Sequence, residues 1–160
     1  MIFLDIVTVM SVGLLTGAEF AVSAFINPVL WRMEDEAQGF AVRAFARLLG
    51  TVMPFWYGGN LLLLAAEAIV RRSQPAAWLL DAACSVWVAV ILLTLIFLLP
   101  INNRLGALPD GAFPDAAKQE HRRWDARHRL RVGALVVAMG MLLVALLGNV
   151  VGIGRLSSMV

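Results

Sequence analysis

The chain is far too apolar for its length to be a water-soluble domain. Of its 160 residues, 61% are hydrophobic and the mean hydropathy is +0.82, whereas roughly 45–50% of the residues in a soluble chain are apolar. The net charge of +2 and the pI of about 9.3 do not indicate a nucleic-acid partner, because basic residues flank membrane spans in any case. The single cysteine, Cys84, excludes an intramolecular disulfide and the membrane thiol oxidoreductases, which need paired thiols.

Four segments are long and apolar enough to be transmembrane helices, for which about 20 residues suffice. None of them alternates polar and apolar residues as a β-barrel strand would, so we predict an all-α, four-transmembrane-helix bundle forming one domain. Proline interrupts helices, and we therefore expect the first span to end at Asn27-Pro28 and the third at Pro100. The first span carries Asp5 and lacks a basic leader, so we expect it to be retained rather than cleaved as a signal peptide. The predicted spans are residues 2–26, 50–70, 76–99 and 130–153.

The connections between these spans differ in length. Residues 71–75 form a short turn, which makes the second and third spans antiparallel neighbours. Residues 36–49 are predicted to form an amphipathic helix resting in the membrane interface, with Phe40 and Leu48 on its apolar side and Arg43 on its polar side. The third connection is long, and from about Asp115 it is predicted to be a charged helix that runs into the fourth span.

The distribution of basic residues predicts the orientation. Arg71, Arg72 and Arg155 lie on one side, and the other ten of the 13 basic residues lie in the two long connections. Those ten are Arg32, Arg43, Arg47, Arg104, Lys118, Arg122, Arg123, Arg127, Arg129 and Arg131. By the positive-inside rule we expect an integral protein of a bacterial inner membrane, with cytoplasmic long connections and outward termini.

Charged residues inside membrane spans are candidates for function, and Glu19 is the clearest of them. It lies deep in the first span, and it shares one helical face with Ser23 and Asn27 at four-residue intervals. Three other acidic residues lie within about a turn of a span end, where they can reach the headgroups, so we interpret them as structural. These are Asp5, Glu67 and Asp81.

A second cluster lies in the run EHRRWDARHRLR, which leads into the fourth span. His121, Trp124, His128 and Arg131 follow a 3-4-3 spacing and share one helical face. A charged run before a span is usually a solvated, membrane-anchoring face, but here both histidines of the chain lie on one stripe. His128 is nearer the membrane, so we expect it to point into the bundle.

The topology brings these clusters to one end of the predicted bundle. The first and third spans end there with Asn27, Asn102 and Asn103, and the fourth begins there with His128 and Arg131. Glu19 is expected about 10 Å deeper, at 1.5 Å per residue. Convergent polar groups in an apolar setting predict a small-molecule cavity between the helices. Two residues of the second span, Tyr57 and Asn60, either pack the helices or line the mouth of this cavity.

Three short motifs together resemble the anthrone-oxygenase-like family of four-span membrane proteins. They are Gly17-Ala18-Glu19-Phe20 with the later Asn27-Pro28, the segment Leu99-Pro100-Ile101-Asn102-Asn103-Arg104-Leu105, and Trp124 with His128 and Arg131. The resemblance covers essentially the whole chain. It implies an oxidoreductase that uses molecular oxygen to convert a small lipophilic aromatic, such as an anthrone, to a quinone.

Such a reaction needs a base and hydrogen-bond donors for the developing oxyanion. Glu19 or His128 is the candidate base, and Arg131, Asn102 and Asn103 are the candidate donors. We expect Asn27, Tyr57, Asn60, His121 and Trp124 to bind the substrate together with Asn103. No haem, flavin or nucleotide motif is present, although a single metal ion on Glu19, His121 or His128 stays open.

Two other classes of function remain as alternatives. Glu19 would serve as the proton-exchanging group of a small proton-coupled transporter, but the known small exporters have much shorter loops. The chain would otherwise be a non-enzymatic membrane partner subunit. Small residues near the C-terminus (Gly148, Gly152 and Gly154) favour self-association into a homo-oligomer.

Overall fold

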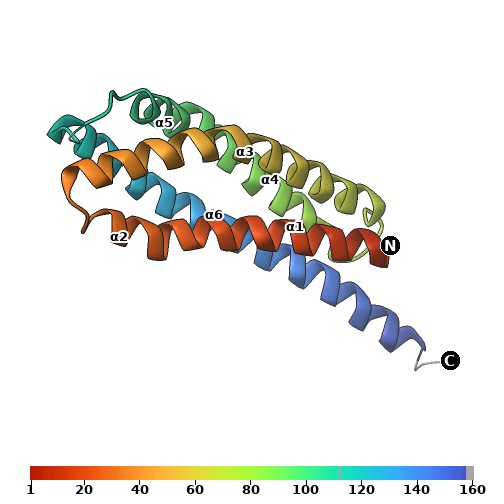
Figure 1. Ribbon diagram of the computed structural model, residues 1–160. Helices are drawn as coiled ribbons and strands as arrows, with labels where there is room; N and C mark the ends of the chain where they lie inside the picture. Colours follow the sequence, from red (N-terminus) through yellow and green to blue (C-terminus); the bar gives the residue numbers. More distant parts are fainter. Residues whose placement is uncertain (112, 158–160) are drawn as a thin grey trace.

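The computed structural model describes residues 1–111 and 113–157, and for the last nine of these only the backbone. Within this part every element is a helix, and four helical segments are long and apolar enough to cross a membrane. Both ends of the described chain lie at one end of the bundle, and the two long connections lie at the other (Figure 1). The predicted all-α, four-helix membrane fold is confirmed.

The first and third long helices do not stop at their prolines. The first consists of α1 (Ile2–Ala21), a π-helical turn η1 (Val22–Ile26) and α2 (Asn27–Leu30). The third consists of α4 (Ala77–Leu93), a π-helical turn η2 (Thr94–Leu98) and α5 (Leu99–Gly106). The prediction that these helices end at Pro28 and Pro100 was therefore wrong.

The π-helical turns account for the continuation. Proline has no N–H to donate, and its ring collides with the carbonyl four residues earlier. Each π-helical turn ends two residues before a proline, at Ile26 before Pro28 and at Leu98 before Pro100. A locally widened turn makes room for the ring and lets the helix go on.

The second long helix, α3 (Asp35–Val70), also corrects a prediction. Residues 36–49 are helical as expected, but they are the first part of an uninterrupted 36-residue helix rather than a separate interfacial one. Phe40 and Leu48 are exposed, whereas Arg43 is buried. The exposed Phe40 and Leu48 fit an apolar side that faces lipid, so only the buried Arg43 departs from the predicted faces. The segment also packs against α5: Asn102 donates to the Ala46 carbonyl (2.8 Å), and Arg47 donates to the Gly106 carbonyl (2.8 Å).

The last helix, α6 (Asp115–Ser157), confirms that the charged segment runs directly into the fourth span. It crosses the bundle and packs mainly against α1 and α4. Gly148 lies close to Ala76 of the same chain, since a Cβ placed on it would be 3.8 Å from the Ala76 Cβ. The side-chain surroundings of Gly152 and Gly154 lie outside the described part, so self-association stays a prediction.

A buried charge network fastens the end of the bundle near the N-terminus. Arg71 donates to Glu67 Oε2 (3.0 Å) and to Asp5 Oδ1 (2.6 Å). Glu67 is fully buried, so it does not reach out to the headgroups as expected. It is buried because Arg71, one turn later on the same side of the helix, supplies its counter-charge. Asp81, by contrast, is exposed.

Candidate functional site

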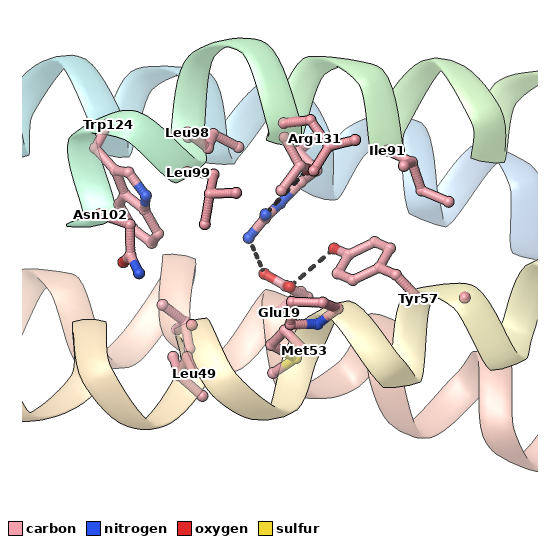
Figure 2. Close-up of a pocket in the computed structure, with 16 residues that line it drawn as sticks. Glu19, Leu49, Met53, Tyr57, Ile91, Leu98, Leu99, Asn102, Trp124 and Arg131 are labelled. Carbon is pink, nitrogen blue, oxygen red and sulfur yellow. Dashed lines mark hydrogen bonds and ion pairs between the residues drawn. The ribbon is translucent and has the colours of Figure 1, made fainter.

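Glu19 is buried at the centre of the bundle and is held by two other helices. Its Oε1 accepts a hydrogen bond from the Tyr57 hydroxyl of α3 (2.8 Å), and its Oε2 accepts one from Arg131 Nη2 of α6 (2.6 Å) (Figure 2). Tyr57 is fixed in turn by Trp87 of α4, whose indole N–H donates to the Tyr57 carbonyl (3.0 Å). A carboxylate buried this deeply is stable only with such a counter-charge and donors.

His128 lies behind this ion pair and holds Arg131 in place. It is fully buried, with Nε2 3.2 Å from the Glu19 carbonyl oxygen and Nδ1 2.9 Å from Arg131 Nη2. A neutral imidazole with its hydrogen on Nε2 satisfies both contacts, because Nε2 then donates and Nδ1 accepts. Trp124 stacks on the ring, with centroids 4.6 Å apart and planes 13° apart.

Arg131 has a third partner, which the sequence did not indicate. Its Nη1 donates to the Thr94 hydroxyl (3.3 Å), and this hydroxyl donates to the Val90 carbonyl (2.8 Å). Thr94 is the first residue of the π-helical turn η2. A hydroxyl in an otherwise apolar stretch shortly before Pro100 is the feature from which Thr94 could have been suspected.

Glu19, Tyr57 and Arg131 line a largely apolar cavity of about 190 Å³. One water molecule needs roughly 10–15 Å³ of cavity volume, so the cavity has room for a multi-ring organic molecule. Figure 2 shows Leu49 and Met53 of α3 across the cavity from Leu98 and Leu99. The polar side chains in its lining are Glu19, Tyr57, Thr94, Asn102, Trp124 and Arg131.

A smaller cavity of about 40 Å³ adjoins the first one, toward the end of the bundle where the two long connections lie. The two cavities share four lining residues, among them Asn102 and Trp124. Asn27 and His121 line only the smaller one. Asn27 donates to Asp125 Oδ1 (2.7 Å), and His121 stacks on Trp31 with centroids 4.7 Å apart.

The structure thus gathers most of the predicted site residues, but not all of them. Five lie at the large cavity and two more line only the small one, while His128 contacts Arg131 from outside the lining. Asn103 is exposed and lies at neither cavity. Asn60 is buried, and its Nδ2 lies 3.5 Å from the Ser11 carbonyl, also away from both cavities. The five at the large cavity are Glu19, Tyr57, Asn102, Trp124 and Arg131.

The three candidate metal ligands do not form one set. Glu19 and His128 meet, with Oε2 and Nδ1 3.3 Å apart. His121 lies two turns earlier on α6, about 10 Å along the helix. In the described part of the chain no group of three or more His, Cys, Asp and Glu side chains is arranged to hold a metal ion.

Replacing Gly50 by alanine is expected to displace Asn102. A Cβ at Gly50 would lie 2.9 Å from Asn102 Nδ2, so the side chain would have to give up its bond to the Ala46 carbonyl, at a cost of about 0.5–1.5 kcal/mol. The matched control is Gly59→Ala in the same helix, where a Cβ meets nothing within 4 Å. Thermal unfolding in detergent should place the Gly50 variant below the Gly59 variant, and equal melting temperatures would contradict the contact.

Comparison with known proteins gives one match. A family model described as anthrone oxygenase matches residues 40–141, which is more than half of the 160 residues. The matched range includes Tyr57, Asn102, His128 and Arg131, whereas Glu19 precedes it. No curated protein and no solved structure matches the chain.

Proposed function

The chain belongs to the anthrone oxygenase family, and from this premise we propose that it is a membrane-embedded oxygenase acting on a small lipophilic aromatic substrate. One observation carries the proposal: a buried carboxylate, paired with a guanidinium, lines a largely apolar cavity. A cavity of this kind suits a flat aromatic molecule with one acidic C–H group and an oxygen that can take up negative charge. Anthrones have both features.

The first step that we propose is removal of a proton from the substrate carbon by Glu19. Its carboxylate lines the cavity, whereas His128 does not, so we favour Glu19 as the base and His128 as a positioning residue. When Glu19 takes the proton it becomes neutral, and the positive charge of Arg131 then balances the new carbanion. The site keeps its net charge through the step, which is the condition for a low barrier in an apolar environment.

In the second step the carbanion reacts with molecular oxygen. A C–O bond forms and, with the proton from Glu19, gives a hydroperoxide. Loss of the remaining proton on that carbon, with cleavage of the O–O bond, leaves a carbonyl group and one water molecule. The balance is one CH₂ group and one O₂ consumed for one C=O group and one H₂O formed, and the electrons come from the substrate. We therefore propose that the chemistry needs no redox cofactor.

The transporter alternative has less support. A carboxylate that exchanges protons for a cationic drug must be free to meet the cation. Glu19 is held by Arg131 at 2.6 Å, and the guanidinium would repel a cationic substrate from the cavity that both residues line. A non-enzymatic partner subunit would leave the cavity and its ion pair without a role.

We also keep the proposed location, a bacterial inner membrane with the long connections in the cytoplasm. The charge distribution along the chain supports it. In this orientation the smaller cavity, with Asn27 and His121 in its lining, lies toward the cytoplasmic end of the bundle.

Oxygen uptake by the purified protein tests the enzymatic proposal. We expect 1,8-dihydroxyanthrone to consume one O₂ per molecule, faster than in a protein-free control, and ¹⁸O₂ to leave one labelled oxygen atom in the quinone. Metal analysis of the same sample addresses the cofactor. Uptake no faster than the control, together with proton-coupled efflux from vesicles, would replace the proposal by the transporter.

A further inference from the structure

The large cavity is not sealed by the helices around it. Two of its lining residues, Pro54 of α3 and Leu95 of η2, are at the same time exposed on the outside of the bundle. α3 packs against α4 and α5 on either side of η2. Between these contacts the cavity separates α3 from η2, and it opens sideways through the gap.

The gap lies at the depth of the hydrocarbon core. Residues 48–66 of α3 carry no charge, between Arg47 and Glu67. At 1.5 Å per residue this stretch is about 28 Å long, close to the roughly 30 Å of a bilayer core. Pro54 and Gly58 both lie inside it, so the opening faces acyl chains rather than water.

The surface around the opening is apolar as well. No charged side chain occurs in residues 48–66 or 82–103, which form the two walls. Large hydrophobic side chains on these walls are exposed, as expected for a face in contact with lipid. They include Val52, Phe55, Leu62, Leu95 and Ile96.

Gly58 leaves free space at the α3 wall of the cavity. It lines the cavity on the α3 side, one residue after Tyr57, and a Cβ placed on it would meet nothing within 4 Å. A larger side chain would therefore project into free space rather than into a neighbouring helix. Gly59 also has free space around it, but it is exposed and does not line the cavity.

We propose that the substrate enters from the acyl-chain region of the bilayer, through the gap between α3 and η2, and that Gly58 keeps this entrance open. The inference rests on the proposed function for the identity of the ligand, a membrane-dissolved polycyclic aromatic. It excludes water-soluble derivatives of the same ring system, because a permanently charged group would have to cross the hydrocarbon core to reach the gap.

A binding assay tests this entrance without relying on turnover. The protein is placed in lipid nanodiscs, and binding of tritiated 1,8-dihydroxyanthraquinone is measured with empty nanodiscs subtracted. We expect the association rate to follow the mole fraction of ligand in the lipid, and a 100-fold excess of anthraquinone-2-sulfonate not to compete. Equal competition by the sulfonate, or a rate that follows the aqueous concentration, would overturn the entrance.

Variants at two glycines locate the entrance on α3. Gly58→Leu should slow association at least tenfold, and Gly58→Ala should slow it less, whereas Gly59→Leu should bind as the wild type does. If the leucine variant does not fold, the association rate of the Gly58→Ala variant still tests the entrance. Wild-type association in both Gly58 variants would contradict the inference, while intact binding without oxygen uptake would contradict only the proposed oxygenase.

Discussion

Replacing Glu19 by glutamine is expected to lower the rate of anthrone-dependent oxygen uptake by about 10²–10⁴-fold, the usual contribution of a general base. Tyr57 and Arg131 now donate to the two carboxylate oxygens at 2.8 and 2.6 Å. The amide has the shape of the carboxylate: its one oxygen can still accept from Arg131, and its NH2 group can donate to the Tyr57 hydroxyl. It cannot take a proton from carbon. We therefore expect binding of 1,8-dihydroxyanthraquinone to change much less than the turnover rate.

Glu67 supplies a matched control for this experiment. It is also a fully buried carboxylate that accepts a hydrogen bond from an arginine, but it lies at the other end of the bundle with Arg71 and Asp5. Glu67→Gln should lower the melting temperature and leave the turnover rate of the folded protein unchanged. If Glu19→Gln kept more than a tenth of the wild-type rate, Glu19 would not be the base.

The course of the helices shows which parts of the fold a sequence predicts. The four spans follow from apolar length alone, because lipid leaves the backbone no alternative to helices. The behaviour at Pro28 and Pro100 does not follow from the local sequence. Proline ends a helix in most settings, but a π-helical turn just before it can absorb the ring. Whether such a turn forms depends on packing against the other helices, which no short segment encodes.

The site was predictable where topology decides it and unpredictable where side-chain packing does. Glu19 and Arg131 meet because the first span ends and the fourth begins at the same end of the bundle. By contrast, His128 lies behind the cavity, where Trp124 stacks on its ring. Asn103 faces outward although Asn102, one residue earlier, lines the cavity. A rotation of the helix by one residue would exchange the orientations of Asn102 and Asn103. Only the contacts between helices determine which orientation is adopted.

Replacing Arg131 by methionine is expected to abolish activity and to destabilise the protein as well. The guanidinium contacts Glu19, His128 and Thr94 at once, and among the described residues no other arginine or lysine forms an ion pair with Glu19. Leaving a buried charge without its partner costs about 3–5 kcal/mol. We expect a clear fall in the melting temperature in detergent.

Two further variants separate the charge of Arg131 from its geometry. The double variant Glu19→Gln/Arg131→Met removes both charges, so it should melt well above Arg131→Met alone while remaining inactive, because a buried pair replaced together is often close to neutral for stability. Arg131→Lys keeps the positive charge. Its ammonium group, on a flexible side chain, cannot reproduce the planar guanidinium that contacts Glu19, His128 and Thr94 together. We expect it to fold with most of the stability restored and to stay at least tenfold below the wild-type rate. A lysine variant with wild-type oxygen uptake would mean that charge alone suffices, and that His128 and Thr94 do not position the group that balances the carbanion.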